Sequence, residues 1–124
     1  MVIRATDTEL ELSGSPAELR SIAAQFVQLN PDSRIRFAAD KDAKPAPYAR
    51  LLVALEVVAS NDAVKVSVID DSLLVTGSPA KLKTFASFFQ FEDGARKGSH
   101  THHEWYPGNE YVDPHSRPLV ISCT

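Results

Sequence analysis

Two stretches of the chain resemble each other: DTELELSGSPAELRSIAAQF at residues 7–26 and DDSLLVTGSPAKLKTFASFF at residues 70–89. Apolar residues keep the same pattern on both sides of the match, and Leu55-Val57-Val58 aligns with Pro118-Val120-Ile121. We interpret this as an internal duplication within a single domain of residues 1–124, with halves at about residues 1–61 and 62–124. The identical pairs are Asp7 and Asp70, Leu10 and Leu73, Gly14 and Gly77, Ser15 and Ser78, Pro16 and Pro79, Ala17 and Ala80, Leu19 and Leu82, Ala23 and Ala86, and Phe26 and Phe89.

Each half is predicted to begin with a β-hairpin and to continue directly into a helix. Ser15 and Ser78 precede Pro16 and Pro79, which is the usual order of an N-cap followed by the first helical residue. Glu18 adds a capping box to the first helix. Apolar residues then recur at helical spacing and should face a sheet: Leu19, Ile22, Ala23 and Phe26 in one half, and Leu82, Phe85, Ala86 and Phe89 in the other. Phe88 and Phe91 fall outside this stripe and are expected at a sheet edge or an interface.

Two more strands should follow each helix, so that each half is a ββαββ unit. The expected fold is therefore α+β: two layers, with a mostly antiparallel sheet of about eight strands and both helices on one face. The expected strands are 2–5, 9–13, 34–39 and 50–58 in the first half, and 64–69, 73–77, 101–106 and 118–123 in the second.

The composition indicates an ordinary globular protein with 44% hydrophobic residues and a net charge of −3. A mildly acidic chain is a poor candidate for nucleic-acid binding, which depends on Lys and Arg. Cys123 is the single cysteine, which excludes an internal disulfide and fits a reducing compartment. We also expect no secretory signal and no membrane span, and hence a cytoplasmic protein. The sequence leaves the oligomeric state open.

One segment, Gly98–Ser116, contains all four histidines, the tryptophan and two of the three tyrosines. On a strand, His100, His102 and Glu104 would project to one face, and His103 and Trp105 to the other. The first three could supply part of a zinc site for a metal-dependent hydrolase, with His115 as a fourth ligand. This pattern is weak, since the chain has no HExxH motif, no cysteine ligand set and no phosphate-binding loop. We therefore expect no metal or other cofactor and no enzymatic activity.

A protein-binding surface uses more of this segment, because Trp, Tyr and Arg dominate interface hot spots. Turns at Pro107-Gly108 and Asp113-Pro114 would hold the aromatic residues in place, and acidic residues would favour a basic partner. A structural module that self-associates through a sheet edge or Phe88 is a further alternative. The candidate partner-binding residues are His100, His102, His103, Glu104, Trp105, Tyr106, Asn109, Glu110, Tyr111 and Asp113.

The stretch HTHHEWYPGNEYVDPHSRPLVIS also resembles the C-terminal signature of a family of small bacterial immunity proteins from polymorphic toxin systems. The resemblance is confined mainly to the last 25 or so residues. It implies a non-enzymatic protein that binds and neutralises a cognate toxin domain. The matching positions are His100, His102, Glu104, Tyr106, Pro107, Gly108, Tyr111, Ser116, Pro118 and Leu119.

Overall fold

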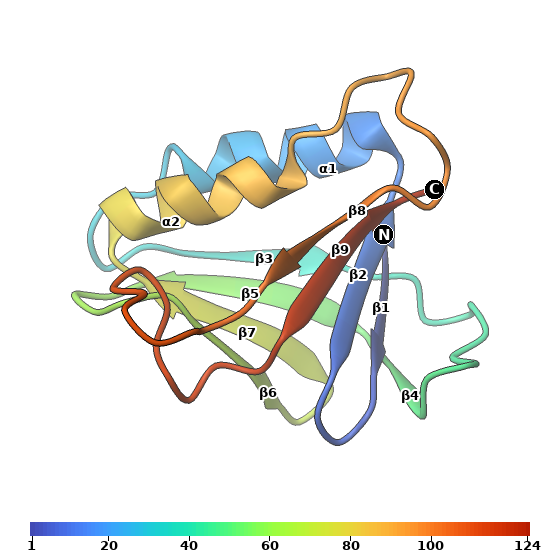
Figure 1. Ribbon diagram of the computed structural model, residues 1–124, viewed down its shortest axis with the longest axis horizontal. Coiled ribbons are helices and arrows are strands. Elements are labelled where there is room, and N and C mark those ends of the chain that lie inside the picture. Colours follow the sequence, from blue (N-terminus) through green and yellow to red (C-terminus); the bar gives the residue numbers. More distant parts are fainter.

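The computed structural model describes residues 1–124, which form two α-helices, one 3-10 helix and nine strands (Figure 1). The first half contains β1 (Val2–Ala5), β2 (Leu10–Gly14), α1 (Pro16–Phe26), β3 (Arg34–Ala38), β4 (Arg50–Leu52) and β5 (Ala54–Ala59). The second contains β6 (Lys65–Ile69), β7 (Ser72–Gly77), α2 (Pro79–Ala86), the 3-10 helix η1 (Ser87–Phe89), β8 (His100–His103) and β9 (Leu119–Cys123). Neither helix is long and apolar enough to cross a bilayer.

The strands form two mixed sheets, with the orders β4-β1-β2-β9-β8 and β3-β5-β7-β6. The predicted α+β class with two helices is confirmed, but the single sheet of about eight strands is wrong. The reason is a break at Val53 in the predicted strand 50–58. Before the break β4 pairs with β1, and after it β5 pairs with β3 and β7. The Val53 N–H donates to the Asp71 carbonyl at 2.8 Å, so the chain passes from one sheet to the other at this residue.

Each sheet combines the hairpin of one half with two strands of the other half, and the five-stranded sheet also contains β4 from the same half as its hairpin. The β1–β2 hairpin joins β9 through a parallel pairing of β2, and the β6–β7 hairpin joins β5 in the same way. Leu10 lies opposite Leu119, and Leu73 lies opposite Leu55. Leu55 therefore corresponds to Leu119, one residue beyond the Pro118 that the sequence alignment paired with it. The burial pattern explains the shift of one residue. Leu119, Ile121 and Cys123 are buried in β9, as Leu55, Val57 and Ala59 are in β5.

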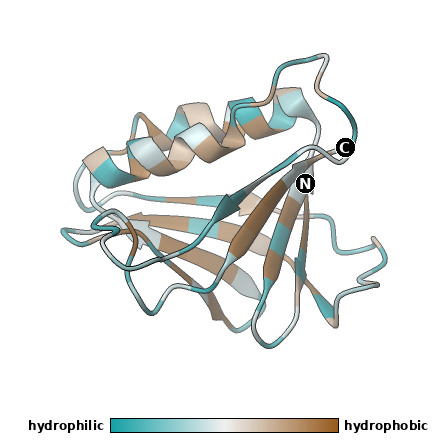
Figure 2. Cartoon of the chain, viewed as in Figure 1, coloured by the Kyte–Doolittle hydropathy of each residue, from teal (hydrophilic) through white to brown (hydrophobic).

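The helices lie together over the same side of the two sheets, and the core between these layers draws on both halves of the chain (Figure 1). The predicted apolar stripes are buried in α1 and α2, with Phe89 of the second stripe buried in η1. The Phe26 ring joins the halves, with centroids 5.7 Å from Phe85 and 5.2 Å from Phe89. Figure 2 shows the matching hydropathy pattern, with apolar residues concentrated on the strands and polar ones in the loops.

Both predicted helix N-caps are present. The hydroxyl of Ser15 accepts a hydrogen bond from the Glu18 N–H at 3.1 Å, and that of Ser78 accepts one from the Lys81 N–H at 3.3 Å. Each satisfies an amide that the helix itself leaves unpaired. The Glu18 carboxylate, which was predicted to close a capping box, instead accepts a hydrogen bond from the N-terminal ammonium of Met1 at 2.9 Å.

Candidate functional site

The histidine- and aromatic-rich segment leaves the sheet earlier than its sequence predicts. Strand β8 ends at His103, and residues 104–118 form a loop that returns to the start of β6. Backbone hydrogen bonds attach this loop there: the Val64 N–H donates to the Tyr111 carbonyl at 2.9 Å, and the Asp113 N–H donates to the Val64 carbonyl at 2.8 Å. The loop is therefore held in place by main-chain hydrogen bonds, although it contains no β-strand.

Hydrogen bonds from backbone amides to polar side chains of the same loop stabilise its turns. The Asn109 side-chain carbonyl accepts a hydrogen bond from the Tyr111 N–H at 3.0 Å, and the Asp113 carboxylate accepts one from the His115 N–H at 2.7 Å. Gly108 has a φ of 89°, in the region that glycine adopts readily. The turns predicted at Pro107-Gly108 and Asp113-Pro114 are both present.

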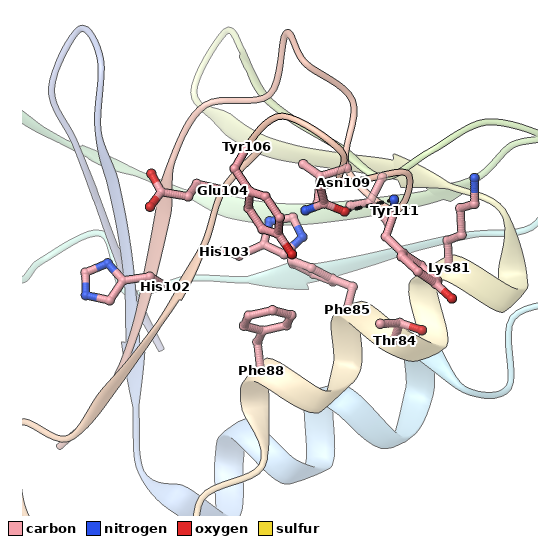
Figure 3. Close-up of a pocket in the computed structure, with 12 residues that line it drawn as sticks. Lys81, Thr84, Phe85, Phe88, His102, His103, Glu104, Tyr106, Asn109 and Tyr111 are labelled. Atoms are coloured by element: carbon pink, nitrogen blue, oxygen red, sulfur yellow. Dashed lines mark hydrogen bonds between the residues drawn. The ribbon is translucent and has the colours of Figure 1, made fainter.

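A pocket of about 280 Å³ lies between this loop and α2 (Figure 3). Three parts of the chain form its wall: the helices α2 and η1, the end of β8 with the loop that follows it, and Val64, the residue before β6. Half of the lining residues are hydrophobic. The lining residues are Val64, Lys81, Thr84, Phe85, Phe88, His102, His103, Glu104, Tyr106, Asn109, Tyr111 and Val112.

His103 lies at the inner end of this pocket and is only 3% exposed. Its ring packs edge-on against Phe85 and Phe88, with centroid distances of 4.7 Å and 5.0 Å. Its Nδ1 atom is buried and has no hydrogen-bond partner. Burial disfavours the charged imidazolium and lowers the pKa of His103 from 6.5 to about 4. The imidazole is therefore neutral at pH 7.

Aromatic side chains and two charged groups form the rim of the pocket. Tyr106 and Tyr111 are 60% and 54% exposed, and the neighbouring Trp105 is 39% exposed. The Lys81 ammonium donates to the Glu110 carbonyl at 3.2 Å. In Figure 3 the Glu104 carboxylate and the Lys81 ammonium point to opposite sides, away from the centre of the pocket. The centre is consequently aromatic and uncharged.

The structure gathers six of the ten predicted binding residues around this pocket: His102, His103, Glu104, Tyr106, Asn109 and Tyr111. The side chains of the other four predicted residues do not line this pocket. His100 lies with His102 along an open polar groove over Val120 and Ser122 of β9. Trp105 does not line the pocket, Glu110 offers its carbonyl to Lys81, and Asp113 holds the loop turn.

The zinc ligand set that we considered does not assemble. The rings of His100 and His102 lie 4.9 Å apart, but nowhere in the chain do three or more His, Cys, Asp or Glu side chains converge. The alternation of the strand explains the placement of the histidines, since His102 is exposed and His103 buried. Glu104 lies beyond the end of β8, so the predicted alternation no longer fixes its direction.

Sequence reasoning missed half of the lining residues, which are Val112 of the loop and the residues contributed by α2, η1 and Val64. Phe88 carried a signal, because it departs from the buried helical stripe, and it is indeed partly buried against the core and lines the pocket. Phe91, which departs in the same way, is buried at 8% exposure. Lys81 and Thr84 are ordinary helix-surface residues in the sequence, and only the returning loop makes them part of the pocket wall.

Comparison with known proteins places the chain in a family. No curated protein and no solved structure matches it. The family model of Immunity protein 32 matches residues 9–32 and 72–124, which include α1, α2, the site loop and β9. This match covers more than half of the chain and confirms the predicted resemblance to immunity proteins of toxin systems. The chain belongs to the Immunity protein 32 family.

Proposed function

We propose that this immunity protein binds and neutralises a cognate bacterial toxin domain, and that it docks through the pocket and its aromatic rim. Membership of the family supports an immunity function and, in general, a toxin as the partner. Such families are generally non-enzymatic, so we infer that the chain acts by occupying a surface of the toxin rather than by altering it chemically.

The observation that carries this proposal is the exposure of two tyrosine side chains that line one pocket, with a third exposed aromatic residue, Trp105, in the same loop. Trp105, Tyr106 and Tyr111 belong to the same loop, and each exposes more than a third of its surface. Exposed apolar groups gathered in one place, beside a concave surface, mark protein-interaction sites. Tyr and Trp are also the residues that contribute most to binding at such sites.

The loop is also prepared for binding before the partner arrives. Main-chain hydrogen bonds to Val64 and Val66 attach its second half to β6, at 2.8–2.9 Å. The Ser116 hydroxyl also accepts a hydrogen bond from the Val66 N–H at 3.1 Å. A surface held in one conformation loses less entropy on association, so more of its contact energy appears as affinity.

The test is the affinity of alanine variants for the toxin domain encoded by the neighbouring gene. Tyr106→Ala and Tyr111→Ala should each weaken binding by about thirtyfold, or about 2 kcal/mol, as expected for hot-spot aromatics. Ile69→Ala is the matched control, because Ile69 is 54% exposed at the end of β6 and does not line the pocket. Equal affinities for all three variants and the wild type would remove the pocket from the interface.

A further inference from the structure

The first half of the chain contains a hollow that corresponds to the pocket. It lies between α1 and β3, has a volume of about 220 Å³, and includes Phe37 and Ala38. Its other lining residues align with pocket residues through the sequence repeat: Met1 with Val64, Glu18 with Lys81, Ser21 with Thr84, Ile22 with Phe85, and Gln25 with Phe88. The two hollows thus occupy equivalent places in the two halves.

Strand register identifies the residue that corresponds to His103. Phe37 pairs with Leu55 on β5, and His103 pairs with Leu119 on β9. Because Leu55 and Leu119 are equivalent, Phe37 and His103 are equivalent too. The Phe37 ring packs edge-on against Phe26 at a centroid distance of 6.1 Å. The fold therefore accepts an all-carbon ring at this position.

Packing alone does not explain an imidazole at position 103. The surroundings of His103 are aromatic, and its buried Nδ1 lacks a hydrogen-bond partner. A buried polar group without a partner costs free energy, and such groups in native structures call for an explanation. The equivalent position shows that phenylalanine would avoid this cost. Nδ1 is covered by protein atoms, so a group that enters the pocket would meet the ring at Nε2, the nitrogen that is not covered. A polar ring with one accessible nitrogen at the inner end of a pocket is suited to a polar group of a binding partner.

The pocket also restricts the chemistry of this partner group. Sites for drug-sized ligands have volumes of about 300–1,000 Å³. The volume of this pocket, about 280 Å³, is slightly smaller and suits one large side chain. The aromatic walls, Phe85, Phe88 and Tyr106, favour an aromatic ring. The uncharged centre offers no counter-charge to an ionised group (Figure 3). A hydroxyl can donate or accept a hydrogen bond, so it matches either tautomer of a neutral imidazole.

We propose that the pocket receives one tyrosine side chain of the toxin, whose hydroxyl forms a hydrogen bond with the His103 imidazole while its ring packs among the aromatic walls. This inference rests on the proposed function, since it names the group by which the toxin is recognised. A hydrogen bond to a polar site also provides specificity, because a partner that lacks the hydroxyl leaves that site unpaired.

Small molecules that copy single side chains test this without the toxin. Binding of p-cresol, toluene and ethylguanidinium, which represent tyrosine, phenylalanine and arginine, is followed by NMR shifts of the purified full chain. We expect p-cresol to bind about tenfold more tightly than toluene and to shift the resonances of His103 and Tyr106. Equal binding of p-cresol and toluene, tighter binding of ethylguanidinium, or no shift at the pocket with any probe would each overturn the proposal.

His103→Phe provides the matched variant, because Phe37 shows that the fold accommodates phenylalanine at the equivalent position. The variant should lose the preference for p-cresol over toluene, while a preference that persists would overturn the role of His103. The wild-type preference alone decides the matter if this variant does not fold. A toxin that fails to bind a chain with the expected preference would contradict the proposed function and not the chemistry of the pocket.

Discussion

Replacing His103 by phenylalanine should remove a loss of stability that the wild type suffers as the pH falls. In the unfolded chain the imidazole has an ordinary pKa of 6.5, and burial lowers that of the native state to about 4. Between these values the unfolded chain binds a proton that the native chain does not bind. The free energy of unfolding therefore falls as the pH drops below 6.5, and the full loss is reached below 4.

The magnitude follows from the two pKa values. At pH 5 the unfolded imidazole is mostly protonated and the native one mostly neutral, so this residue alone lowers the free energy of unfolding by about 2 kcal/mol relative to pH 7. The full shift corresponds to about 3 kcal/mol. At pH 7 the variant should also be more stable by about 1 kcal/mol, because the Nδ1 atom without a hydrogen-bond partner is gone.

Urea unfolding at pH 7 and pH 5 measures both effects, with the slope of the transition checked for constancy. His115→Ala is the control, since it removes an exposed histidine and should retain the wild-type loss. If His103→Phe loses as much stability between pH 7 and pH 5 as the wild type, His103 is not a buried neutral group. The argument that a neutral imidazole at this position serves a binding partner would then fail.

Three further predictions concern the fold and the site. Ser15→Ala and Ser78→Ala should each lower the free energy of unfolding by about 1 kcal/mol in thermal or urea denaturation, because each removes an N-cap hydrogen bond. Gly77→Ala should cost about 1–3 kcal/mol, because its Cβ would lie 3.0 Å from Val64 Cγ2 and 3.2 Å from Val64 Cα. Gly94→Ala, with nothing within 4 Å of the added carbon, should stay within about 0.5 kcal/mol of the wild type in the same assay. Zinc should leave the thermal midpoint of the purified protein unchanged, since no three ligand side chains converge; a stoichiometric upward shift would contradict this.

Local signals predicted the elements of this fold well. The repeated Ser-Pro pairs located both helix starts, and the helical spacing of apolar residues identified the buried faces. These features depend on neighbours in the sequence. The division into two sheets does not, because it arises from pairing between halves, β2 with β9 and β5 with β7. Nothing local at Val53 marks the residue at which one predicted strand becomes two.

The candidate site could be predicted only in part for the same reason. Its loop was conspicuous in the sequence, because it concentrates histidine and aromatic residues. Residues of α2 line the pocket only because the loop returns to the start of β6. Hydrogen bonds to Val64 fix the place of this return. The internal repeat also contains information about the site, but only together with the strand register. Once strand register is known, it identifies His103 as a histidine in a place where the other half has phenylalanine.

Co-expression with the toxin domain encoded by the neighbouring gene tests the central claim most directly. The proposed function predicts that the wild-type chain keeps the cells alive and co-purifies with the toxin in a stoichiometric complex. Tyr111→Ala should weaken both the protection and the complex, whereas Ile69→Ala should preserve them. Cells that die in the presence of folded wild-type protein, with no complex recovered, would contradict the claim that this chain neutralises that toxin by binding it.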